Sequence, residues 1–88
     1  MLVLFAARLW PAADPRADSE ANAGLELARA GKYEQAIAHY RAALKLDAAM
    51  PGLQLNLGLA YFKLNRFAEA IGSFEQAVKA PIFSGRSR

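Results

Sequence analysis

The stretch Asn56–Lys79, NLGLAYFKLNRFAEAIGSFEQAVK, repeats the pattern of Asn22–Lys45, NAGLELARAGKYEQAIAHYRAALK, at a spacing of 34 residues. The matched pairs are Gly24 with Gly58, Tyr33 with Phe67, Ala36 with Ala70, Ile37 with Ile71, Tyr40 with Phe74, Ala43 with Ala77 and Lys45 with Lys79. A period of this length is typical of a repeat array, in which one helical hairpin cannot bury its apolar face alone and stacks on a neighbour. The repeat therefore predicts a binding function rather than catalysis.

Two helices are expected in the first copy. The first begins between Asp14 and Ser19, where several capping residues surround Pro15, and it ends at Ala30, because Gly31 adopts the left-handed conformation easily. The second is expected over residues 33–46. It carries one apolar stripe at helical spacing, made of Tyr33, Ile37, Tyr40 and Leu44.

The second copy contains a local pattern that favours a strand. Its leucines alternate with Gln54, Asn56 and Gly58, which is the period of a half-buried strand. The repeat overrules this pattern, because the aligned segment ANAGLELARAG is rich in Ala, Glu and Arg, and because the run exceeds the usual strand length. We therefore expect a helix from Pro51 to just before Asn65, which tolerates the left-handed conformation.

The fourth helix is expected from Phe67 to about Ala80, with Pro81 ending it and a frayed segment following. The sequence also predicts that its apolar stripe serves its own hairpin, the stripe being Phe67, Ile71, Phe74 and Val78. Because nothing after Pro81 is long enough to form a shielding helix, we expect the isolated chain to be marginally stable or to self-associate.

Composition divides the chain into four parts: an apolar segment and linker over residues 1–16, one repeat over 17–50, a second over 51–84, and a basic tail over 85–88. The apolar run Met1–Trp10 is too short to span a bilayer and lacks the preceding positive residues of a secretory signal. Three interpretations stay open: the remnant of a signal peptide or anchor, a strap packed on the first repeat, or disorder. Only the first would indicate an exported or periplasmic protein; the localisation is otherwise unknown.

The second copy resembles the tetratricopeptide repeat. Its Leu57-Gly58 pair is followed at the family's spacings by Tyr61, Ala70, Phe74 and Ala77, and Gln54 stands where the family often has Trp. The first copy matches less fully, through Ala23-Gly24, Leu27, Ala36, Tyr40 and Ala43. The resemblance implies an all-α fold of two stacked helix-turn-helix hairpins in a right-handed solenoid, whose inner surface is built mainly by the first helix of each repeat.

The third helix is apolar on two faces. One stripe contains Leu53, Leu57, Tyr61 and Leu64 and is expected to pack inside the hairpin, whereas the other contains Leu55, Leu59 and Phe62. By resemblance, the second stripe lies in a concave groove that holds a partner peptide or helix. The candidate groove residues are Ala21, Asn22, Leu25, Arg29, Leu55, Asn56, Leu59, Phe62 and Lys63. In the alternative interpretation, this stripe packs against neighbouring hairpins or the N-terminal apolar segment.

Some tetratricopeptide proteins hold the acidic C-terminus of heat-shock chaperones with a clamp of Asn and Lys side chains. This sequence keeps Asn22 and Asn56 at one clamp position, for which a capping or bridging role is the alternative. It replaces the other clamp residues by the apolar Leu25, Leu59, Ala21 and Leu55. The resemblance therefore favours an apolar or amphipathic partner segment over an acidic tail.

The sequence contains no recognisable set of residues that would act together in catalysis or metal binding. With no Cys and one His there is no thiolate metal site, and no Gly-rich phosphate loop occurs. His39 lies off the apolar stripe without a convincing acid/base partner nearby, so we expect it to face solvent. The net charge of +3 is mixed along the chain and indicates ordinary solvated surface rather than nucleic-acid binding. We predict no enzyme, no cofactor and no metal.

The sequence therefore predicts a protein-interaction module that presents an apolar concave groove, as part of a longer array. The rival hypothesis is structural: the apolar surface serves homo-oligomerisation or docking within a parent chain, without a separate ligand. Membrane contact is expected only if Met1–Trp10 belongs to an incomplete anchor.

Overall fold

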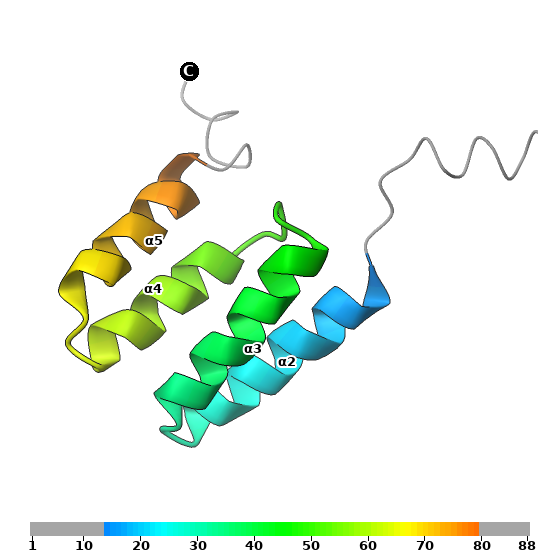
Figure 1. Ribbon diagram of the computed structural model, residues 1–88, viewed down its shortest axis with the longest axis horizontal. Coiled ribbons are helices and arrows are strands. Elements are labelled where there is room, and N and C mark those ends of the chain that lie inside the picture. The colour runs from blue at the N-terminus through cyan, green and yellow to red at the C-terminus, as the bar shows by residue number, and fades with distance from the viewer. Residues whose placement is uncertain (1–13, 80–88) are drawn as a thin grey trace, which may run out of the picture.

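A computed structural model of the protein describes residues 14–79. These residues form four α-helices and no strand: α2 (Pro15–Arg29), α3 (Tyr33–Leu46), α4 (Leu53–Lys63) and α5 (Phe67–Lys79). Figure 1 shows α2 and α3 as one antiparallel hairpin and α4 and α5 as a second, with α4 packed beside α3. The predicted all-α fold of two hairpins is confirmed. The interpretations of Met1–Trp10, of Pro81 and of the basic tail lie outside the described residues.

The start of α2 and the residues that follow α2 and α4 have specific capping geometry. Asp14 caps α2, because its Oδ1 accepts a hydrogen bond from the backbone N–H of Arg16 at 2.9 Å. Beyond the ends of α2 and α4, Gly31 (φ 81°) and Asn65 (φ 62°) adopt the left-handed conformation expected of them.

The start of α4 differs from the prediction. It begins at Leu53 rather than at Pro51, because Gly52 precedes it with a left-handed φ of 78°. A left-handed residue cannot belong to a right-handed helix, so Pro51 lies in the turn before α4.

The core fills the space between the helices with small residues set against large ones. Tyr40 and Leu53 are its largest fully buried side chains, and they lie among alanines that are at most 2% exposed: Ala36, Ala43, Ala60 and Ala70. Two glycines allow this close approach. A Cβ atom at Gly24 would lie 2.7 Å from the ring of Tyr40, and one at Gly58 would lie 2.6 Å from the ring of Phe74.

The outer face of α5 contradicts the prediction that its stripe serves its own hairpin. Phe67, Ile71 and Val78 are 49%, 56% and 70% exposed, and of the stripe only Phe74 packs against the core. Ile37, which corresponds to Ile71 in the first repeat, is 5% exposed. The difference arises because α4 packs on α3, whereas no element in the described part of the chain covers the matching face of α5.

Candidate functional site

The exposed face of α4 carries three large apolar side chains in a row. Leu55, Leu59 and Phe62 are 45%, 48% and 52% exposed, while Leu57 and Tyr61 on another face of the same helix are buried in the core. Successive residues of an α-helix are turned by about 100°, so leucines that alternate along the sequence separate onto different faces. The alternation therefore produces one buried and one exposed apolar stripe. We call Leu55, Leu59 and Phe62 the α4 stripe.

The candidate residues on α2 lie on a helix that touches α4. Asn22 and Arg29 are exposed, and Leu25 is half-buried. Arg29 donates from Nη1 to Oε2 of Glu26 at 3.1 Å, a solvent-exposed ion pair. Ala21 packs instead against the core and offers little surface to a partner.

Polar side chains border the α4 stripe. Asn56 is half-buried and Lys63 is exposed at the C-terminal end of the helix. The stripe with these neighbours has the composition of a small interface, in which an apolar centre is surrounded by polar groups. The set keeps Asn22 and Asn56 at one clamp position, but the apolar Leu25 and Leu59 stand where a further clamp Asn is expected from the resemblance.

Phe67 is a surface residue that the sequence interpretation missed. Its ring lies edge-to-face against Phe62, with the centroids 5.5 Å apart and an interplanar angle of 63°. The tight turn after α4 brings Phe67, the first residue of α5, beside the last turn of α4. Phe67 contacts Phe62 because of this turn, although its spacing places it in the apolar stripe of α5. Phe67 therefore extends the α4 stripe toward the turn.

Arg66 holds this turn in place. Its guanidinium lies 5.0 Å from the ring centroid of Tyr61 and pairs with both carboxylate oxygens of Glu69 at 2.8 Å. The side-chain hydrogen bonds from Arg66 lower the pKa of Glu69 below its usual range. A further contact, 3.3 Å to Glu34, reaches across to α3.

His39 has a partner that its sequence neighbours did not indicate. Its Nδ1 donates to Oε1 of Glu20 at 2.7 Å, and both side chains are partly exposed. The expectation that His39 lacks an acid/base partner is therefore wrong. The antiparallel hairpin brings together α2 and α3 residues that are distant in sequence. The pair links the two helices, and the part of the chain described holds no group of three potential metal ligands around it.

Within residues 14–79, none of the helices has both the length and the apolar character needed to cross a bilayer.

Known proteins share the repeat seen in this structure. The sequence signature described as Tetratricopeptide repeat matches residues 22–85, which is most of the chain. The match begins within α2 and extends past the end of α5, so it includes the second half of α2 and all of α3, α4 and α5. No solved structure matches the chain.

Relatives with named functions are much longer proteins. Human intraflagellar transport protein 70A is 30% identical over 69 residues, which cover 78% of this chain and 10% of that protein. The cattle form is 39% identical over 54 residues, covering 61% of the chain and 8% of the protein. Human intraflagellar transport protein 70B is 32% identical over 65 residues, which cover 74% of this chain and 10% of that protein. The chain thus spans about a tenth of the length of the relatives it matches.

Proposed function

We propose that this chain, which belongs to the tetratricopeptide repeat family, binds a partner protein through the α4 stripe. Members of this family are generally protein-interaction modules and typically non-catalytic scaffolds. The observation that carries the proposal is the row of three half-exposed apolar side chains on a helix whose other face is fixed in the core. Because the helix is already formed, its backbone loses little conformational freedom on binding.

The spacing of the stripe defines the partner segment. Leu55, Leu59 and Phe62 are separated by four and three residues, which is the spacing of one helical face. An amphipathic helix with its own apolar residues at this spacing can lie along the stripe, as in other helix-in-groove interactions. Asn22, Leu25 and Arg29 on α2 extend the proposed surface, and Asn56 and Lys63 form its polar border on α4.

A fluorescent amphipathic peptide with leucines at helical spacing tests the proposal, with binding followed by anisotropy. Leu59→Lys is expected to raise the dissociation constant at least about tenfold, because it places a charge within the apolar contact. Ile71→Lys is the matched control, since it adds the same charge at an exposed apolar position on α5. At a concentration low enough to prevent self-association, both variants should retain the melting temperature of the parent chain.

Two results would contradict the assignment. The first is a peptide affinity that is unchanged by Leu59→Lys or reduced equally by Ile71→Lys. The second is tight binding of an acidic peptide with a free C-terminus that depends on the α4 stripe, because an apolar stripe offers no partner for its carboxylates.

A second candidate function is structural. The exposed side chains of Ile71 and Val78 on α5 favour self-association, or docking to another part of a parent chain, without a separate ligand. The two functions use different helices, so substitutions on α4 and on α5 separate them.

A further inference from the structure

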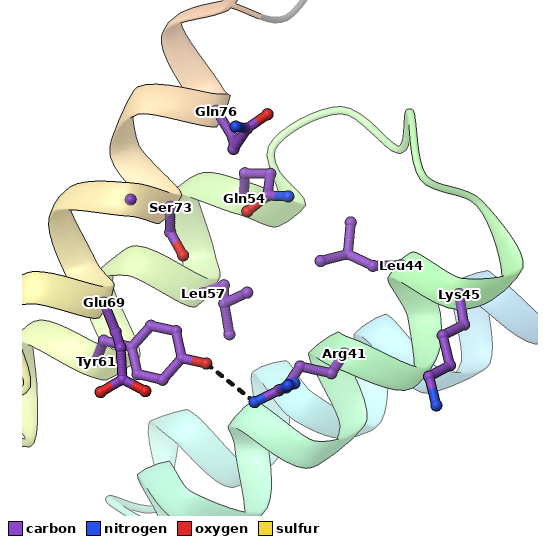
Figure 2. Close-up of a pocket in the computed structure, with 10 residues that line it drawn as sticks. Arg41, Leu44, Lys45, Gln54, Leu57, Tyr61, Glu69, Ser73 and Gln76 are labelled. Carbon is purple, nitrogen blue, oxygen red and sulfur yellow. Dashed lines mark hydrogen bonds between the residues drawn. The ribbon is translucent and has the colours of Figure 1, made fainter.

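A hollow lies at the junction between the two hairpins. Figure 2 shows its three walls: Arg41 and Lys45 on α3, Tyr61 and neighbouring residues on α4, and Ser73 with Glu69 on α5. Its volume is about 410 Å³, and Gln54 and Gln76 lie at one end. The α4 residues that line it belong to a different face from the α4 stripe. We call this space the junction hollow, and it plays no part in the function proposed above.

The junction hollow carries unbalanced positive charge. Arg41 and Lys45 lie one turn apart on α3, and no ion pair joins either of them to a carboxylate among residues 14–79. Among residues 14–79, the Arg41 guanidinium makes a single hydrogen bond, a long one of 3.4 Å from Nη1 to the hydroxyl of Tyr61. Glu69 on the opposite wall is paired with Arg66 at 2.8 Å; the hydrogen bonds from Arg66 lower its pKa most and the charge of Arg41 contributes, so Glu69 offsets only part of the two positive charges. An anionic group is therefore the complement of this wall.

The floor of the junction hollow is apolar. Leu57 is buried at its base, and Leu44 is half-buried beside it. Gly72 opens the α5 wall, since a Cβ atom at this position would meet nothing within 4 Å. Gln54, Gln76 and Ser73 supply neutral groups that both donate and accept hydrogen bonds, as the amides of a peptide backbone require.

We propose that the junction hollow is a second protein-binding site, which takes an acidic side chain against Arg41 and Lys45 and an adjacent apolar side chain on Leu44 and Leu57. The charge complementarity favours an acidic residue on the partner. A peptide is favoured over a nucleic acid, because nucleic-acid affinity depends on several phosphate contacts and the hollow has only two basic residues, Arg41 and Lys45. A single segment can satisfy both walls, because the charged wall and the apolar floor adjoin at Arg41 and Leu44.

Two blocked dipeptides test the proposal on the full chain labelled with ¹⁵N: N-acetyl-Leu-Asp-amide and its uncharged analogue N-acetyl-Leu-Asn-amide. The aspartyl probe is expected to shift the resonances of Arg41, Lys45, Gln54 and Gln76. We expect it to bind about two- to fivefold more tightly than the asparaginyl probe, the range of a partly exposed ion pair. The double variant Arg41→Gln/Lys45→Gln should abolish this difference. The control Arg29→Gln/Lys63→Gln removes the same charge from other surfaces and should preserve it.

A third variant tests the cavity independently of charge. Gly72→Phe adds a bulky side chain at the open α5 wall of the junction hollow and should weaken the binding of both probes, while the melting curve shows that the chain remains folded. The proposal is overturned if both dipeptides bind equally, or if the shifts lie on the α4 stripe. It is also overturned if a short thymidine oligonucleotide binds more tightly through Arg41 and Lys45, which would make the site one for nucleic acid.

Discussion

Two glycines of the second hairpin illustrate how a single position depends on its surroundings. A Cβ atom at Gly58 would lie 2.6 Å from two carbons of the Phe74 ring, so the ring or the helix would have to move. At Gly72, in the interior of α5, the same atom would meet nothing within 4 Å. The first glycine is required by packing, whereas the second only lowers the helix propensity of α5.

Substitutions at these glycines are therefore expected to change stability in opposite directions. Gly58→Leu should lower the free energy of unfolding by about 1–3 kcal/mol, because overpacking separates α4 from α5. Gly72→Ala should raise it by about 0.5–1 kcal/mol through helix propensity alone. Urea unfolding of both variants measures the two effects. An unchanged stability for Gly58→Leu would contradict the packing described here.

Asp14 makes the first turn of α2 sensitive to acid. Hydrogen bonds from the side chain and backbone of Arg16 lower the pKa of Asp14, so the folded state favours the charged carboxylate. The cap therefore stabilises α2 fully above the ordinary carboxyl pKa of about 4, and this stabilisation is lost as the pH falls through the lower value of the folded state.

The expected result is faster exchange of the Arg16 amide proton, relative to its intrinsic rate, once the pH falls below about 4. Asp14→Ala should show this loss of protection at every pH. Asp14→Asn retains a capping acceptor but cannot titrate, so its protection should not depend on pH in this range. Equal pH profiles for the parent chain and Asp14→Asn would exclude Asp14 as the titrating group.

At the scale of elements, α4 shows how far the sequence determines the fold. Alternating leucines indicate a strand locally, yet the period of 34 residues correctly predicts a helix, because the repeat encodes a hairpin that must stack. The start of α4 was not predictable with the same certainty. Pro51 is a favoured first helical residue, but the left-handed Gly52 after it excludes that role.

The turns between helices depend on one left-handed residue each. Asn65 has a φ of 62°. Asn tolerates this left-handed conformation better than most residues that carry a side chain, but at some cost in free energy. Asn65→Gly should be neutral or stabilising. Asn65→Val should lower the free energy of unfolding by about 1–2 kcal/mol, because a β-branched residue is strained in this conformation. Thermal unfolding of the two variants is the measurement, and similar melting temperatures would argue against a strained turn.

The sequence predicts the candidate site correctly where the exposure of a side chain depends only on its position around one helix. Helical spacing separates Leu55, Leu59 and Phe62 from the buried stripe, and the structure leaves all three half-exposed. Contacts between elements were harder to predict. Phe67 faces Phe62 because of a turn, and His39 meets Glu20 across a hairpin, so neither follows from the pattern of one helix. That a partner binds the stripe stays a prediction.

At the scale of the molecule, the two outer faces differ in polarity. On α2, the residues that correspond to the buried Leu53 and Ala60 of α4 are Ser19 and Glu26, and both are exposed. This outer face is therefore polar. The opposite end of the described structure is α5, which exposes Ile71 and Val78. Within the described residues, apolar surface for stacking a further hairpin is therefore offered by the outer face of α5 and not by that of α2.

Self-association of the isolated chain through α5 is therefore expected. Ile71 and Val78 line an open hollow with Phe74, Glu75 and Lys79, and burying this apolar surface in a second copy removes it from water. The mass measured by sedimentation equilibrium should rise with concentration, and the melting temperature should rise with it, because association stabilises the folded state by mass action.

Substitution of the apolar α5 residues should separate association from folding. The double variant Ile71→Lys/Val78→Lys is expected to remain monomeric, since two added charges on each copy oppose contact between identical faces. Leu59→Lys adds charge on the α4 stripe instead and should still associate, which distinguishes the α5 face from apolar surface in general. A well-folded monomer of the parent chain at high concentration, with a cooperative melt that does not depend on concentration, would contradict the prediction. Two hairpins would then suffice for a stable domain, and the apolar face of α5 would be tolerated in water without a cover.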